Sequence, residues 1–138
     1  MKLIRTLGVD RAEVAGRNFR LIYNDCVMEL MSWEDNCVEG MVLTSIPFGT
    51  QYEYCPSLHD FGHNPDNEAF FVQMNFMVPH LHRVLAPGRM AAIHVKDRIQ
   101  FGNVTGFAVP TVEPFSDHTT AVFRKHGFHL LARITVDT

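Results

Sequence analysis

The residues best placed to do chemistry are Ser45, Pro47 and Phe48, which follow an apolar run, Met-Val-Leu-Thr, at positions 41–44. A hydroxyl oxygen and backbone carbonyls accept hydrogen bonds, and a phenyl ring offers a stacking face worth about 1–3 kcal/mol per base. An exocyclic amine on a nucleobase is a poor nucleophile, because its lone pair is delocalised into the ring. A site that uses such an amine must hold the flipped base, accept hydrogen bonds from its N–H groups and exclude water. The segment has groups for that chemistry, although a turn carrying a core aromatic has the same residue types.

Further side chains could contact a nucleic acid: Tyr52, Tyr54, Lys96 and Arg98. The two tyrosines could stack on bases, or they could cover the edge of the core. Lys96 and Arg98 follow the end of another expected strand, so one of them could reach the same cleft, although a solvated charge cluster is the commoner outcome. The net charge of −3 provides no general positive field for a polyanion, so any nucleic-acid contact must be local.

Histidines and serines suggest other chemistries that the pattern does not favour. His59 and His63 are four residues apart, a spacing that presents both to a metal on a helix, but they fall in an expected loop without a third well-spaced ligand. We therefore predict no metal site. His94 is expected to be a hydrogen-bonded core or edge histidine rather than a base. The chain has neither the Gly-x-Ser-x-Gly elbow of hydrolases nor a phosphate-binding Gly-x-x-x-x-Gly-Lys-Ser/Thr loop.

The Ser-Ile-Pro-Phe sequence at 45–48 resembles motif IV of the amino-methylating DNA methyltransferases, which reads Asp/Asn/Ser-Pro-Pro-Tyr/Phe after an apolar strand commonly ending in Thr. The resemblance covers residues 19–138. Other segments that are similar to the family are Asn-Asp-Cys at 24–26, compared with Gly-Asp-Cys; Arg-Val-Leu-Ala-Pro-Gly at 83–88, compared with Arg-Val-Leu-Lys-Pro-Gly; and the Gly-Phe step at 127–128. Residues 52–64 resemble a phage- or prophage-associated branch.

This resemblance implies a site-specific enzyme, of the restriction-modification kind, that uses S-adenosyl-L-methionine to methylate DNA at the exocyclic amine of cytosine (N4) or adenine (N6). Serine at the first motif position tends, within the family, to accompany N4-cytosine enzymes. By the same resemblance, Ser45, Pro47 and Phe48 are expected to be catalytic. Asp25, Cys26 and Ser45 are expected to contact the cofactor.

Two departures from the family pattern shape the expectation for this chain. Ile46 stands where the family has its first proline, and the cofactor-binding Phe-x-Gly-x-Gly loop is absent from the sequence. We therefore expect the catalytic half of a methyltransferase, which by itself binds S-adenosylmethionine weakly or not at all and is inactive. The alternative is a truncated, non-catalytic prophage remnant or an interaction module that keeps the fold.

The hydrophobic periodicity and the turn residues predict an α/β domain with a mostly parallel sheet flanked by helices, a partial Rossmann-like methyltransferase fold by the resemblance. Residues 1–18 are expected to form an N-terminal arm and residues 19–138 the catalytic part. Pro79 is expected to kink its helix or shift the helix boundary. The expected elements are strand 19–23, a helix capped at 24–25, strand 38–44, loop 46–65, helix 66–85, strand 89–95, loop 97–110, helix 111–126 and strand 128–136.

Composition bounds the location and the assembly of the protein. The three cysteines, Cys26, Cys37 and Cys55, form no CxxC pair, which fits neither a disulfide scaffold nor a four-ligand zinc site and favours a reducing cytoplasm, that of a bacterial or phage-infected cell. No run approaches the roughly 18 apolar residues of a membrane span. In the resembled family the cofactor loop lies on strands between those ending near residues 24 and 45. Without them a central sheet edge is left open, so we expect a homodimer or larger assembly.

Overall fold

The computed structural model describes residues 10–49 and 52–136 of the chain. Its central feature is a pair of parallel strands, β3 (Val42–Ser45) and β4 (Ala91–His94), with Ser45 opposite His94 in the register. The long helix α2 (Asn67–Val84) connects the two strands, as parallel pairing requires a crossover. This unit confirms the strand, loop, helix and strand that the sequence predicts between residues 38 and 95.

Side-chain caps define where the first two helices begin. The carboxylate of Asp25 accepts a hydrogen bond from the Met28 amide at the start of α1 (Cys26–Ser32), which confirms the predicted cap. Asp66 does the same for Ala69 at the start of α2. Pro65 therefore lies before the cap rather than in the first helical turn, and α2 continues through Pro79 to its end at Val84.

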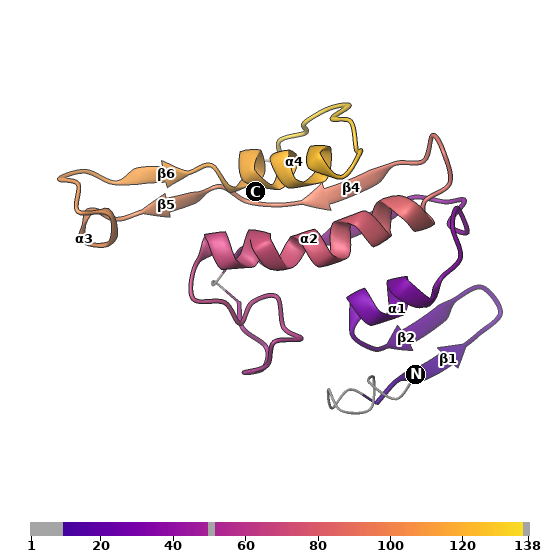
Figure 1. The fold of residues 1–138 in the computed structure, drawn as a ribbon. Coiled ribbons are helices and arrows are strands. Elements are labelled where there is room, and N and C mark those ends of the chain that lie inside the picture. Colours follow the sequence, from indigo (N-terminus) through magenta and orange to yellow (C-terminus); the bar gives the residue numbers. More distant parts are fainter. Residues whose placement is uncertain (1–9, 50–51, 137–138) are drawn as a thin grey trace.

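The core lies along one side of α2. Phe70, Met74, Val78, Leu81 and Val84 are buried at the helical spacing of three and four residues, so they form one apolar stripe. Helices α1 and α4 (Phe115–Lys125) both pack against α2 (Figure 1). The core cluster also contains Phe115 and Phe123 from α4, and Ile46 and Phe48 from the segment after β3.

The expected loop 97–110 is wrong, because this part of the chain forms a β-hairpin. Strands β5 (Arg98–Gln100) and β6 (Thr111–Glu113) pair antiparallel, and the single-turn helix α3 (Gly102–Thr105) lies at the tip that projects from the body (Figure 1). The strands are only three residues long and alternate between half-buried and exposed positions, so no apolar period marks them in the sequence. The last helix consequently starts at Phe115 and not at residue 111.

The N-terminal region also contains a hairpin that the sequence did not indicate. Strand β1 (Ala12–Ala15), within the expected arm 1–18, pairs antiparallel with β2 (Arg20–Tyr23) beside α1 (Figure 1). Residues 1–9 of the arm lie outside the described residues. The predicted strand at 19–23 is thus present, but its partner is β1. The parallel arrangement expected of the sheet holds for β3 and β4, whereas the other two strand pairs are antiparallel hairpins.

Within residues 10–49 and 52–136, one apolar segment has no strand partner and another has a partner on one side only. The strand expected at 128–136 is not formed, because a strand needs a neighbouring backbone and none pairs with this segment there. Likewise, β3 pairs only with β4 in the described part, and its Leu43 side chain is 75% exposed. No helix among the described residues is long and apolar enough to span a membrane.

The core can be tested by comparing two phenylalanines on the same helix. Phe70 is fully buried among aromatic rings, whereas Phe76 is 63% exposed. We expect Phe70→Ala to lower the free energy of unfolding by about 3–5 kcal/mol and Phe76→Ala to change it by no more than about 0.5 kcal/mol. Urea denaturation followed by the fluorescence of Trp33 measures both values. Equal losses in the two variants would contradict the assignment of the core.

Candidate functional site

The first candidate centre lies where β3 and β4 end side by side. The parallel register places Ser45 and His94 opposite each other at the carboxyl ends of the two strands, and both residues are exposed. The Ser45 hydroxyl oxygen lies 3.0 Å from His94 Nδ1, within hydrogen-bonding distance. This confirms His94 as a hydrogen-bonded edge histidine and places its imidazole directly at the predicted catalytic serine.

The segment after Ser45 turns back into the core. Ile46 and Phe48 are buried, with Phe48 only 9% exposed, and Pro47 between them is half-buried. The Phe48 ring meets the rings of three neighbours edge-on, with centroids 6.0 Å from Tyr52, 5.8 Å from His94 and 6.4 Å from Phe115. Phe48 therefore anchors the segment. These neighbours cover most of the ring. Its use as a stacking face for a base remains a prediction.

Arg98 at the base of the β5–β6 hairpin holds the turn that follows Phe48. Its guanidinium donates a hydrogen bond of 2.7 Å to the Phe48 carbonyl. The next residue, Gly49, has a φ of +62°, and a Cβ there would lie 2.1 Å from the side-chain oxygen of Asn67. Both the backbone conformation and the close approach require glycine at this position. The charge of Arg98 is thus directed at the backbone of the turn, and its contact with a nucleic acid stays a prediction.

Asp60 organises the loop that carries the two predicted tyrosines. Its buried carboxylate accepts hydrogen bonds from the amides of Tyr54, Cys55 and Gly62. Burial raises the pKa of Asp60, but these backbone bonds lower it by more, so that the pKa lies below its ordinary value. A Cβ at Gly62 would lie 1.8 Å from the Tyr52 carbonyl oxygen, so the loop closes tightly there. Tyr54 is 82% exposed and Tyr52 is 49% exposed.

The predicted cofactor residues form a second centre at the start of α1. While one carboxylate oxygen of Asp25 caps the helix, the other lies 2.7 Å from His59 Nδ1. The Cys26 sulfur lies 3.8 Å from Met77 Sδ, and burial together with the Asp25 charge raises the pKa of this thiol to about 11. Ser45 makes no contact with these residues in the described part of the chain.

Asp25 and His59 border a cavity of about 690 Å³ between the start of α1, the loop at 58–64 and the first half of α2. Its walls are largely apolar, from side chains such as Phe61, Val72 and Phe76, and carboxylates stand at its rim. A cavity of this size is within the range of small-molecule sites. Ser45 is not among its lining residues. The structure thus brings the predicted catalytic and cofactor residues together in two groups rather than one.

The remaining predicted residues make few contacts. Lys96 is exposed, and its neighbour Asp97 accepts a hydrogen bond from the Ser116 amide in the first turn of α4. His63 lies 3.1 Å from Glu53, and His59 is paired with Asp25. No group of three or more His, Cys, Asp or Glu side chains that could hold a metal ion occurs in residues 10–49 and 52–136.

Sequence reasoning missed the partners of two predicted residues. His94 ends the next parallel strand, and a polar residue in that place is a signal that it shares an edge with Ser45. His59, in the loop before α2, pairs with the carboxylate of Asp25. No spacing rule indicates that pairing, because it depends on how the loop folds over α1.

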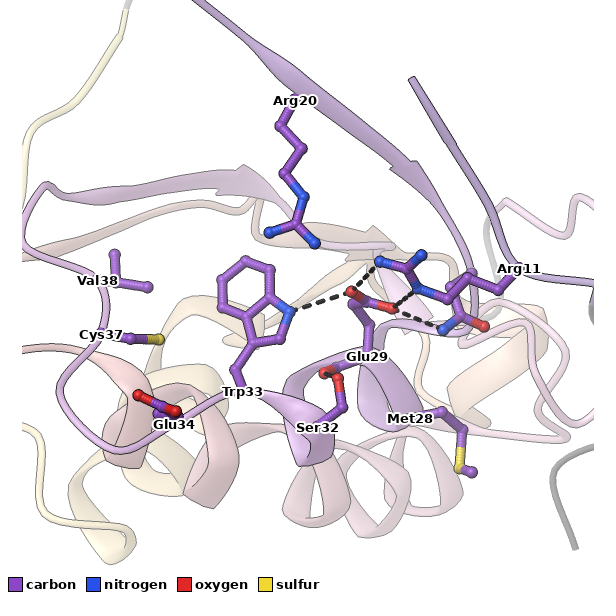
Figure 2. A pocket seen from close by; sticks show the side chains of 10 residues that line it. Arg11, Arg20, Met28, Glu29, Ser32, Trp33, Glu34, Cys37 and Val38 are labelled. Carbon is purple, nitrogen blue, oxygen red and sulfur yellow. Dashed lines mark hydrogen bonds and ion pairs between the residues drawn. The ribbon is translucent and has the colours of Figure 1, made fainter. Parts of the chain in front are cut away.

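A cluster around Glu29 fixes the N-terminal hairpin to α1 (Figure 2). The buried carboxylate of Glu29 accepts hydrogen bonds from Arg11, Asn24 and the Trp33 indole. These interactions, the Arg11 bond first, lower the pKa of Glu29 to about 2, although burial opposes them. The cluster lines a pocket of about 630 Å³ that contains none of the predicted site residues. Its carboxylate already neutralises Arg11, so the cluster is structural.

Comparison with solved structures identifies the fold. Two similar structures are both of TTHA0409 from Thermus thermophilus, a "Putative DNA Modification Methylase", and one of them is complexed with S-adenosyl-L-methionine. The complexed structure has a TM-score of 0.57 and 27% identity over 78% of this chain. The other has a TM-score of 0.58 and 26% identity, also over 78%. No family model and no curated protein matches the chain.

The similarity confirms the predicted fold class: the chain has a partial, Rossmann-like α/β methyltransferase fold. It also supports the resemblance to DNA methyltransferases seen in the sequence, at low identity. The chain spans about two fifths of the length of these structures, 39% and 40%.

The Glu29 cluster predicts how stability depends on pH. Because the pKa of Glu29 in the folded protein lies below its ordinary value of 4.5, its stabilisation is complete above that pH and is lost as the pH falls towards about 2. We expect Glu29→Gln to remove about 1–2 kcal/mol of stability at neutral pH, since Arg11 is partly screened by water, and to flatten the loss between pH 4.5 and 2.

Urea denaturation at a series of pH values measures this effect. Glu34→Gln is the matched control, because Glu34 is exposed on the same pocket and makes no hydrogen bond among the described residues. An acid profile of Glu29→Gln that is as steep as that of the wild type would contradict the role of Glu29.

Proposed function

We propose that this chain carries the catalytic motif of an S-adenosylmethionine-dependent DNA methyltransferase that acts on the exocyclic amine of cytosine (N4) or adenine (N6). The main support is the position of Ser45, which is exposed at the carboxyl end of a parallel strand and hydrogen-bonded to His94. The fold is similar to that of the "Putative DNA Modification Methylase" complexed with S-adenosyl-L-methionine. In parallel α/β sheets this edge is where ligands bind.

The groups after β3 fit an amine-bearing base. Ser45 Oγ and the backbone carbonyls of Ile46 or Pro47 are acceptors for the two N–H groups of the amine. Tyr52 is 49% exposed and its ring meets that of Phe48 edge-on, so it offers a base more open surface than the buried Phe48 ring. By accepting these hydrogen bonds, the oxygens raise the electron density on the amine nitrogen and fix its orientation. Both effects make this poor nucleophile more reactive.

The cavity beside α1 fits part of a cationic cofactor that carries a flat ring. Its apolar walls suit an aromatic base, and the carboxylates of Asp25, Asp66 and Glu68 at its rim suit positive charge. S-adenosylmethionine, when bound, supplies an electrophilic methyl group. Asp25 lines this cavity and would hold the cofactor from the start of α1, whereas Cys26 is not among the lining residues, so its contact with the cofactor would have to come from outside the cavity. Because the sequence lacks a Phe-x-Gly-x-Gly loop, these residues alone would bind it weakly.

DNA would contact the same edge of the molecule through local groups. Tyr54 and Lys96 are exposed there without side-chain partners among the described residues, whereas Arg98 would act by holding the turn at Phe48. The net charge of −3 means that such contacts add only modestly to affinity, so recognition of a DNA site requires further protein surface.

A second candidate is a non-catalytic interaction module with a methyltransferase fold. It is favoured by the exposed apolar side chains of the C-terminal segment, Leu130, Leu131, Ile134 and Val136. A surface of this kind is typical of a protein contact. The two candidates differ in whether Ser45 matters for a reaction.

Removal of the Ser45 hydroxyl tests the enzymatic function. In the protein expressed at its full encoded length, we expect Ser45→Ala to lower the rate of methyl transfer to DNA on the order of 10²-fold, because one positioned acceptor is lost. Incorporation of tritiated methyl groups measures the rate. Ser45 is exposed, so the unfolding midpoint should hardly change, whereas Phe48→Ala would also disturb the core and is a less clean test.

The matched control is Ser32→Ala, which removes an exposed serine at the end of α1 and should keep the wild-type rate. Wild-type turnover in Ser45→Ala would refute the assignment of the motif. Absence of methylation by the wild-type protein on any cytosine- or adenine-containing substrate would favour the interaction module.

We also propose that the 138-residue chain self-associates through the edge of β3 that has no partner strand among residues 10–49 and 52–136. Leu43 is exposed on that strand, and open apolar edges tend to pair with another chain. Light scattering should show a dimer or larger species, and Leu43→Lys should shift it to a monomer. Val109→Lys, at an exposed apolar position between α3 and β6, is the control. A monodisperse wild-type monomer would rule out this association.

A further inference from the structure

We propose that His94 is a positioning residue for Ser45, which in its neutral form keeps the lone pairs of the serine oxygen free for the target amine. This inference rests on the proposed methyl transfer and adds a residue that the motif itself does not contain. Its basis is the 3.0 Å contact between Ser45 Oγ and His94 Nδ1 at the ends of β3 and β4.

The backbone fixes the approach of the two side chains. Ser45 and His94 are register partners in a parallel pair, so their side chains leave the same face of the sheet at its carboxyl edge. The imidazole is held on its other side by the Phe48 ring, which it meets edge-on at an interplanar angle of 69°. Phe48 is in turn packed on Phe115 in the core. The imidazole therefore has a defined place beside the serine.

The direction of the hydrogen bond determines what Ser45 can accept. A hydroxyl has one proton and two lone pairs. When His94 is neutral with its proton on Nε2, Nδ1 accepts the Ser45 proton, and both lone pairs of Oγ face outwards. When His94 is protonated, its Nδ1–H donates to Oγ and occupies one lone pair. The imidazolium also places a positive charge beside a nitrogen that becomes more positive as its bond to the methyl group forms.

Few ionisable groups compete for His94. Strand β3 and residues 46–49 carry no ionisable side chain. On the chain after β4, Lys96 is exposed, Asp97 bonds to the Ser116 amide, and Arg98 bonds to the Phe48 carbonyl. From α4 the near side chain is the apolar Phe115, which contacts Phe48. In the described part of the chain, Ser45 is thus the polar side chain that engages the imidazole.

Two substitutions separate positioning from packing. His94→Phe keeps a ring against Phe48 but removes the acceptor. His94→Asn places an amide oxygen near the position of Nδ1 and cannot be protonated at neutral or mildly acid pH. We expect His94→Phe to lower kcat about tenfold at pH 7.5, the value of one hydrogen bond, with KM for DNA unchanged. His94→Asn should stay within about threefold of the wild-type kcat.

The dependence of the rate on pH separates the two roles of His94, because a residue that only packs would not change it. The wild-type rate should fall when acidification protonates the imidazole, and the His94→Asn rate should not. The control His129→Asn alters an exposed histidine in the C-terminal segment and should keep the wild-type profile. Wild-type rates and pH dependence in His94→Phe would overturn the positioning role while leaving the methyl transfer itself intact.

Nitrogen-detected NMR on the chain tests the hydrogen bond without any activity. At pH 7.5, His94 should show the Nε2–H tautomer, and Ser45→Ala should shift the Nδ1 resonance. An Nδ1–H tautomer, or no response to Ser45→Ala, would overturn the proposal. A wild-type protein that shows this hydrogen bond but never methylates DNA would instead overturn the proposed function, and with it the role of His94 in that reaction.

Discussion

Parallel pairing of β3 with β4 is the constraint on which the rest of the structure depends. It requires a crossover, which α2 provides, and it fixes Ser45 opposite His94 at one edge. A shift of one residue in this register would turn Ser45 to the opposite face and separate it from the imidazole. The chemistry of the site is therefore a consequence of strand register, and the strands are held in place by the aromatic core of α2 and α4.

The end of β3 and the segment after it contribute apolar side chains to the core and also present a polar side chain to solvent. Ile46 and Phe48 are buried and join the core, whereas Ser45 remains exposed. Ile46 stands where the resembled family has a proline, so the backbone there is less rigid. Burial of the isoleucine side chain and the hydrogen bond from Arg98 to the Phe48 carbonyl restrain the turn instead. The departure from the family pattern thus has a local structural compensation, and the position of the serine does not rest on proline alone.

The sequence predicts those elements whose signals are local. The cap at Asp25 and the end of α4 at Lys125, shortly before Gly127 with its φ of +96°, follow from residue types at short spacing. The β5–β6 hairpin and the unpaired segment 128–136 could not be predicted in this way, because pairing depends on distant backbone. The same holds for the site: the motif at 45–48 is visible in the sequence, but the contacts of Ser45 with His94 and Asp25 with His59 arise from the tertiary fold.

The distribution of exposed apolar residues is consistent with the separation of the two centres. In the resembled family, further strands lie between those that end near residues 24 and 45, and they would cover the edge of β3 where Leu43 is exposed. Here β2 pairs with β1, and it does not pair with β3 among the described residues. Asp25 follows the β1–β2 pair and Ser45 belongs to the β3–β4 pair, so different strand pairs position the two residues. Whatever covers the edge of β3 would also fix the distance between Asp25 and Ser45. The proposed methyl transfer would require that distance to be set within fractions of an ångström. Under that proposal, a partner strand on β3 would both cover its apolar edge and bring the two groups of residues into register.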